Sequence, residues 1–169
     1  MGEESMAPLD DVDLRLLTLL QVDGRRTHAA LGKDVGLTGP SVYARIKRLE
    51  REGVIRGYTA ILAPEALDQS LVAFLRVGTA ASPGEQEPFE TFVAARSEIL
   101  ECHDVDGEDS YVLKVRLSSP RTLRLLLADI RAIPGITRTV TSIALETVKE
   151  VRGGAHLADP RRPAEGGDG

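Results

Sequence analysis

Two helical patterns separated by one glycine, within residues 27–57, constrain the fold of this chain more than any other stretch. Apolar residues at helical spacing occupy 28–35, and Gly36 follows where a helix commonly ends in a left-handed residue. Leu37 adds an apolar side chain to the turn, and Thr38 is the expected N-cap of the next helix. Two short helices joined by such a turn indicate a helix-turn-helix.

The second helix of this pair has an apolar side and a basic side. Val42, Ile46 and Leu49 recur at i, i+4 and i+7, so they should face the core. Five basic residues against two acidic ones lie between Thr38 and Arg56. The side chains expected to point away from the core are Pro40, Ala44, Lys47, Arg48 and Arg51, with Ser41 and Tyr43 at the edges and Arg45 on the flank.

A basic helix face is more often a solvated surface than a nucleic-acid interface. The turn, the cap and the two-helix context favour DNA, because a merely solvated helix does not need them. Arg56, in the following turn, is equally consistent with a phosphate contact and with an exposed arginine. The predicted DNA-binding residues are Thr38, Pro40, Ser41, Tyr43, Ala44, Arg45, Lys47, Arg48, Arg51 and Arg56.

Composition limits how such a protein can bind DNA. The chain has 169 residues and a net charge of −5, and residues 1–63 carry equal numbers of basic and acidic side chains. Any DNA contact must therefore be local rather than due to bulk positive charge.

The cysteine content and the hydrophobic runs indicate the compartment. Cys102 is the single cysteine, which excludes an intramolecular disulfide, and no apolar run approaches the roughly 20 residues that span a bilayer. We expect a cytoplasmic protein with no membrane partner.

A further helix should precede the pair, so that three helices form one compact unit. Asp10 is its expected N-cap, with Asp13 completing a weak capping box, and the helix should stop near Asp23 and Gly24. Residues 53–58 are interpreted as a turn into a short strand pair, or wing. The expected apolar stripe consists of Val12, Leu16, Leu19 and Leu20.

The second half of the chain has the order β-α-β-β-α-β. Strands are predicted at 71–77, 100–105, 111–117 and 136–145, and helices at 85–96 and 120–133. Residues 106–110 form a polar hairpin turn between the middle strands. This order predicts a ferredoxin-like α+β fold, with two helices on one face of a four-stranded antiparallel sheet. The other face should carry apolar residues and pair with a second copy of the chain.

The predicted domain organisation has five parts. These are a disordered N-terminus at 1–8, a winged helix-turn-helix at 9–59, a hinge at 60–70, a ferredoxin-like domain at 71–150 and a disordered Gly/Pro-rich tail at 151–169.

An enzyme is the alternative of a different class. Cys102 and His103 are the one sequence that suggests a nucleophile and a base, but neighbours on a strand point to opposite faces. His28 and His156 provide no metal-ligand spacing, and there is no glycine-rich phosphate loop. We therefore expect no catalytic residues, no metal and no cofactor.

The chain resembles the Lrp/AsnC, or feast/famine, family of transcription regulators. The resemblance rests on residues 9–58, LDDVDLRLLTLLQVDGRRTHAALGKDVGLTGPSVYARIKRLEREGVIRGY, on GEDSYVLKV and on IPGITRTVTSIALETVKE. It implies a winged helix-turn-helix for double-stranded DNA, a hinge, and a sensing domain through which homodimers form and assemble into larger rings, often octamers.

The resemblance also implies a small-molecule effector, commonly an amino acid, at the contact between dimers. Many relatives have Asp where this chain has Ser110, so amino-acid binding at this turn and a plain hairpin turn are weighed equally. The implied effector residues are Gly107, Glu108, Asp109 and Ser110 in the turn, approached by Thr139, Thr141 and Ser142 of the last strand.

The leading hypothesis is a sequence-specific transcription regulator modulated by such an effector. A ligand-independent architectural protein that wraps DNA is the alternative, because both would use the same helix and the same oligomer.

Overall fold

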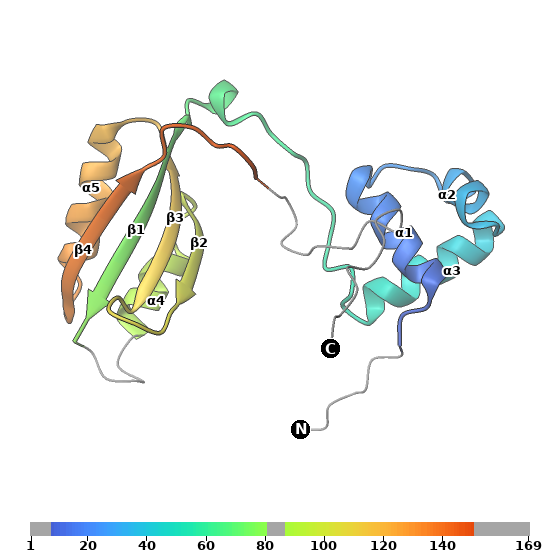
Figure 1. Cartoon of the computed structure of the whole chain (residues 1–169), viewed down its shortest axis with the longest axis horizontal. Helices are drawn as coiled ribbons and strands as arrows, with labels where there is room; N and C mark the ends of the chain where they lie inside the picture. The colour runs from blue at the N-terminus through green and yellow to red at the C-terminus, as the bar shows by residue number, and fades with distance from the viewer. Residues whose placement is uncertain (1–7, 81–86, 151–169) are drawn as a thin grey trace, which may run out of the picture. The chain divides into compact units, whose positions relative to one another are not determined.

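The computed structural model describes residues 8–80 and 87–150, which fall into two compact units that divide after Ala60 (Figure 1). None of the helices in these two stretches has the length and apolarity needed to cross a membrane. The predictions of disorder at 1–8 and 151–169 lie almost wholly outside these residues, as does the start of the predicted helix at 85–96. The other predicted domain boundaries stay predictions.

The N-terminal unit consists of the helices α1 (Asp11–Val22), α2 (His28–Val35) and α3 (Gly39–Arg51). The capping box predicted for α1 is present: Asp13 N donates to Asp10 Oδ1 at 2.8 Å, and Asp10 N donates to Asp13 Oδ2 at 3.2 Å. Leu16, Leu31, Val42 and Ile46 form the buried core. The apolar sides predicted for the first and third helices are therefore confirmed.

The turn between α2 and α3 has the predicted geometry. Gly36 adopts a left-handed conformation with φ of 71°, and the Thr38 hydroxyl accepts from Ser41 N at 3.4 Å as the N-cap of α3. Gly32 is a second glycine that the turn requires, because a Cβ there would lie 2.3 Å from the carbonyl oxygen of Leu37. A backbone hydrogen bond between the same two residues closes the turn, because Leu37 N donates to Gly32 O at 2.9 Å.

The strand pair predicted for residues 53–58 is absent from the structure, which has turns and irregular backbone there. A strand needs a hydrogen-bonded partner. The amides of Val54 and Ile55 instead donate to the carbonyl of Leu49, at 2.9 and 3.1 Å, and hold this segment against the end of α3. The helix-turn-helix is therefore confirmed without a β-structured wing in the described chain.

The segment predicted as a hinge contains one short 3₁₀ helix, η1 (Pro64–Leu67). Pro64 lies in its first turn, where a missing amide hydrogen costs nothing. Asp68, with φ of 53°, ends it in a left-handed conformation before the first strand begins.

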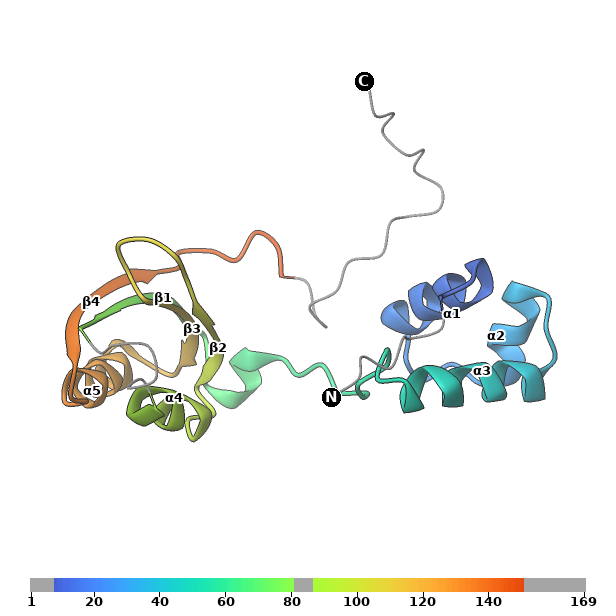
Figure 2. The same cartoon turned by 90° about the horizontal axis from the view of Figure 1, so that it is seen from below.

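The second unit has the predicted ferredoxin-like arrangement. Its strands form one antiparallel sheet in the order β2-β3-β1-β4, and both helices lie on the same face (Figure 2). The observed elements are β1 (Leu71–Thr79), α4 (Glu87–Ala94), β2 (Ile99–Asp104), β3 (Tyr111–Leu117), α5 (Pro120–Arg131) and β4 (Ile136–Ile143).

The core of this unit lies between the sheet and the helices. On β3, residues 111, 113, 115 and 117 are buried while those between them are half-buried, which is the alternation expected of a strand with one face in the core. From β1, Leu75 and Val77 face the same core, and from α5 Leu126 and Ile130 do so.

The helix-free face of the sheet is less apolar than predicted. The register places Arg76 of β1 opposite Val112 of β3 and Val140 of β4, so these three side chains share that face. On the same face, Lys114 and Arg116 follow Val112 along β3, and Arg138 precedes Val140 along β4. The face is therefore a mixture of apolar and cationic side chains, and its pairing with another copy stays a prediction.

Candidate functional site

The outward side of α3 is the first candidate site. The N-cap hydroxyl of Thr38 lies 2.9 Å from the hydroxyl of Ser41, at the open N-terminus of the helix. A helix N-terminus with free amides favours contact with phosphate oxygens. The predicted DNA-binding residues that are exposed are Thr38, Pro40, Ser41, Tyr43, Ala44, Lys47, Arg51 and Arg56.

Two of the predicted DNA-binding residues, Arg45 and Arg48, lie against α1 instead. Arg45 Nη1 is 2.9 Å from Asp13 Oδ1 and 2.6 Å from Asp10 Oδ2, and Arg48 Nη2 donates to Asp13 Oδ2. Asp13 is 0% exposed, whereas each arginine side chain keeps 30% exposure. Hydrogen bonds from Arg45 lower the pKa of Asp10, and those to Asp10 and Asp13 raise the pKa of Arg45.

The inward position of Arg48 differs from the outward one that helical periodicity predicted. The reason is that a buried carboxylate needs partners, and long arginine side chains can bend back to reach it. The sequence contained a signal that the periodicity argument did not use. Asp13 lies at i−3 from Leu16 and i−7 from Leu20, within the apolar stripe of α1, where a charged residue predicts a buried pair.

Tyr43 is an exposed aromatic ring with support on two sides. Its ring lies edge-on to His28 at 5.3 Å between centroids, and Lys47 Nζ lies 5.8 Å from the ring centre. Lys47 also pairs with Glu50 at 2.6 Å, which raises the pKa of Lys47 and lowers that of Glu50. Tyr58 Oη donates to the same Glu50 at 3.1 Å, and these side chains border a cavity of about 230 Å³.

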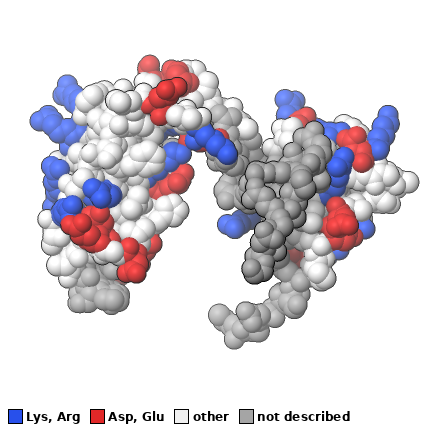
Figure 3. All heavy atoms as spheres, in the orientation of Figure 1, with Lys and Arg blue, Asp and Glu red and all other residues white. Residues whose placement is uncertain are grey.

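Arg51 and Arg56 make no ion pair within residues 8–80 and 87–150, so their charges are available to a ligand. Acidic and basic side chains are otherwise mixed on the visible surface of both units (Figure 3). DNA binding through a small local set of cations is consistent with this mixture.

The turn between β2 and β3 is the second candidate site. Asp109 is only 8% exposed, and its carboxylate lies 3.6 Å from Arg76 Nη1 and 4.0 Å from Arg138 Nη1. Its Oδ1 atom has no hydrogen-bond partner in the described chain. Arg138 also pairs with Glu108, which raises the pKa of Arg138.

Ser110 and Gly107 have structural roles in this turn. Ser110 N donates to Val77 O at 2.9 Å, and its hydroxyl accepts from Thr79 N at 3.2 Å, which fixes the turn to β1. Gly107 has a φ of 133°, a conformation that favours glycine.

The last-strand residues predicted to approach the turn do not reach it within one chain. Thr139 and Thr141 lie opposite Val77 and Leu75, on the helix-covered side, and Arg131 Nε donates to Thr139 Oγ1 at 2.7 Å. Ser142 is on the open face but lies opposite Phe74, near the middle of β1, whereas the turn contacts β1 at Val77.

The structure instead brings Arg76 and Arg138 to Asp109. The sequence reasoning missed both arginines. Cations at alternating positions on the open faces of β1 and β4 were the signal that could have found them.

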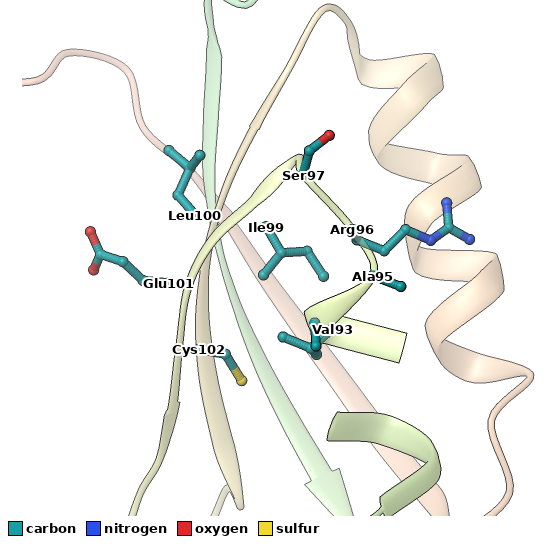
Figure 4. A pocket seen from close by; sticks show the side chains of 9 residues that line it. Val93, Ala95, Arg96, Ser97, Ile99, Leu100, Glu101 and Cys102 are labelled. Carbon is teal, nitrogen blue, oxygen red and sulfur yellow. The ribbon is translucent and has the colours of Figure 1, made fainter. Parts of the chain in front are cut away.

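The Cys102–His103 pair does not form a catalytic dyad. Cys102 lies opposite Leu113 and His103 opposite Val112, so their side chains occupy opposite faces of the sheet. Burial raises the pKa of the Cys102 thiol, which favours the protonated form over the nucleophilic thiolate. Figure 4 shows Cys102 and Ile99 pointing toward the end of α4, beside a shallow cavity of about 510 Å³, while Leu100 and Glu101 point away.

His103 lies 3.6 Å from Glu101 and is 64% exposed, as expected for a surface imidazole. In the parts of the chain that the structure describes, no group of three His, Cys, Asp or Glu side chains is placed to hold a metal ion.

Two family models match the two units. Residues 9–50 match the AsnC-type helix-turn-helix domain, and residues 72–153 match the Lrp/AsnC ligand binding domain. The chain is also 40% identical over 144 residues to the leucine-responsive regulatory protein of Escherichia coli strain K12, which covers 84% of this chain and 88% of that protein.

Solved structures give the same result. A transcriptional regulator of Neisseria meningitidis in complex with L-methionine aligns with a TM-score of 0.81 and 29% identity, over 86% of this chain and 95% of that one. The feast or famine regulatory protein of M. tuberculosis complexed with L-methionine aligns with a TM-score of 0.77 and 36% identity, over 89% and 100%. These matches span both units, and the chain belongs to the Lrp/AsnC family of transcription regulators.

Proposed function

We propose that this regulator reads double-stranded DNA with the exposed side of α3, two copies of which a homodimer presents to a near-palindromic site. The observation that carries the proposal is the free outer surface of α3 beside its capped N-terminus. Ser41, Tyr43 and Ala44 lie nearest to base edges in such a complex, because the first turns of a recognition helix enter the groove. Lys47 and Arg51, with Arg56 beyond the helix, contact phosphates.

Electrophoretic mobility shift against DNA upstream of its own gene tests this surface. Ser41→Ala and Arg51→Ala should each weaken binding by about tenfold, the effect of losing roughly 1–2 kcal/mol of contact. Arg124→Ala is the matched control, because Arg124 is an exposed arginine on α5 of the other unit. Binding that neither α3 variant changes would sink the assignment of this face.

We further propose that an amino acid binds at the β2–β3 turn and modulates DNA binding. The α-carboxylate would pair with Arg76 and Arg138, and the α-amino group would bond to Oδ1 of Asp109, which accepts no hydrogen bond from the described residues. The L-methionine complexes of the two relatives support an effector of this class. The turn residues Gly107, Glu108 and Ser110 would shape the site, with Thr139, Thr141 and Ser142 supplied by another copy.

A thermal-shift screen of the twenty amino acids tests the effector. A ligand at a hundred times its Kd stabilises the folded state by about 2.7 kcal/mol and must raise the melting temperature. Asp109→Asn should abolish that shift. No shift with any amino acid would favour the alternative, a ligand-independent architectural protein that wraps DNA.

We also propose that the open face of the sheet pairs copies into dimers, which assemble into larger rings such as octamers. A stable monomer at micromolar concentration in light scattering would contradict this. The proposed setting is the cytoplasm, because the target is DNA, and the proposal includes no enzymatic activity.

A further inference from the structure

We propose that Asp13 is a positioning residue for DNA recognition, which keeps Arg45 and Arg48 of α3 bound to α1 and away from the DNA phosphates. This role rests on the DNA binding proposed above and specifies which of the cations on α3 take part in it. Arg45 and Arg48 then act inside the protein, and the phosphate contacts of the helix fall to Lys47 and Arg51.

The geometry supports this division because both carboxylate oxygens of Asp13 are occupied. Oδ1 accepts from Arg45 at 2.9 Å, and Oδ2 accepts from Arg48 and from the amide of Asp10 at 3.2 Å. The carboxylate is fully buried, so water cannot replace either arginine. Asp10 adds a second carboxylate to Arg45, at 2.6 Å.

A second carboxylate, that of Glu52, also lies beside the guanidinium of Arg48. Its Nε lies 3.9 Å from Glu52 Oε2, and both atoms are buried without a hydrogen bond in the described chain. Arg48 therefore lies between two carboxylates, one on α1 and one at the C-terminal end of α3.

Moving either arginine to a phosphate would leave the Asp13 carboxylate buried and short of a partner. Removing one member of a buried ion pair costs more than an ion pair at the solvent-exposed surface returns. The contacts also join residues 32 and 35 positions apart, so they fix the orientation of α3 on α1. Arg51, which has no such partner, is free to extend.

The dependence of DNA affinity on salt separates the two kinds of arginine. Each phosphate that a cation neutralises changes the slope of log K against log salt by about 0.9. In the full-length protein, Arg51→Ala should flatten the slope by about 0.9 for each bound copy. Arg48→Ala should leave the slope unchanged while lowering the melting temperature.

Asp13→Asn is the converse test, because asparagine keeps the shape of the side chain but removes the charge that holds both arginines. The slope should become steeper by up to about 1.8 for each bound copy as two cations are released to phosphates. Asp11→Asn is the control, because Asp11 is an exposed aspartate two residues earlier on α1, and it should leave the slope and the melting temperature unchanged.

An Arg48→Ala slope that flattens as much as that of Arg51→Ala would overturn the proposal, as would an unchanged slope in a folded Asp13→Asn protein. If Asp13→Asn does not fold, Arg48→Ala decides alone. A wild-type protein that shifts no DNA removes the DNA-binding proposal and this role together, whereas normal binding with the wrong slopes removes only the role of Asp13.

Discussion

Among the described residues, each unit of this protein has one buried carboxylate flanked by two arginines, and the two sites differ in how completely they are bonded. Asp13 in the helical unit is 0% exposed, and its oxygens receive hydrogen bonds from Arg45 and Arg48. Asp109 in the sheet unit is 8% exposed, its nearest arginine nitrogens are 3.6 and 4.0 Å away, and Oδ1 has no hydrogen bond in the described chain. A saturated carboxylate stabilises the fold, whereas an unsaturated one keeps bonding capacity for a ligand.

The helical side of this comparison predicts the largest effect on stability. Asp13→Ala should lower the free energy of unfolding by about 3 kcal/mol, the low end of the range for broken buried pairs, because both arginines retain partial exposure. Urea denaturation followed by circular dichroism measures the loss. Asp11→Ala should stay within about 0.5 kcal/mol of wild type. Equal effects in the two variants would refute a special role for Asp13.

Tyr111 sharpens the comparison, because it is a buried polar group that is neutral and fully bonded at neutral pH. It is 2% exposed and donates to Glu90 Oε1 at 3.0 Å. Burial, together with this hydrogen bond, raises the pKa of Tyr111 from 10.0 to about 12. Because the raised pKa favours the neutral form in the folded state, its stabilisation is complete below pH 10 and is lost as the pH rises toward 12.

Between pH 10 and 12 the free energy of unfolding should fall by about 1–2 kcal/mol as Tyr111 ionises, and urea denaturation at several pH values measures this fall. Tyr111→Phe has no phenol to ionise, so its stability should vary less between pH 10 and 12. If the free energy of unfolding depended on pH in the same way in wild type and Tyr111→Phe, the loss of stability could not be due to ionisation of Tyr111.

The sheet side of the comparison predicts a small effect on stability. Asp109→Ala should change the free energy of unfolding by less than about 1 kcal/mol, because its ion pairs are long and both arginine side chains are more than two-fifths exposed to solvent. The same variant should lose any rise in melting temperature that amino acids produce in wild type. A loss as large as that of Asp13→Ala would make Asp109 a structural residue and remove the contrast.

Local rules predicted most of the fold from the sequence. Asp10 and Thr38 cap their helices as expected, and β3 alternates between the core and the open face, since each depends on neighbours within a few residues. The same rules could not predict interactions between distant segments. Arg48 turned inward because Asp13, 35 residues away, is buried, and residues 53–58 bonded to Leu49 instead of forming a strand pair.

The candidate effector site was predictable only in part for a similar reason. The turn itself is local, and its position between β2 and β3 is confirmed. Arg76 and Arg138 reach it from strands that are neighbours in the sheet but far apart in the chain. Whether these arginines lie beside the turn depends on the order and register of the strands, and neither can be read directly from a single sequence.

The exposed side of α3 has a consequence for how this regulator changes over evolution. Pro40 and Ala44 are exposed, and neither belongs to the apolar core of the helical unit. If DNA binds this side of α3 as proposed, their replacement alters the surface offered to DNA at little cost in folding, while Gly32 and Asp13 keep the framework unchanged. Descendants of one ancestral regulator can acquire new target sequences one substitution at a time without first evolving a new scaffold.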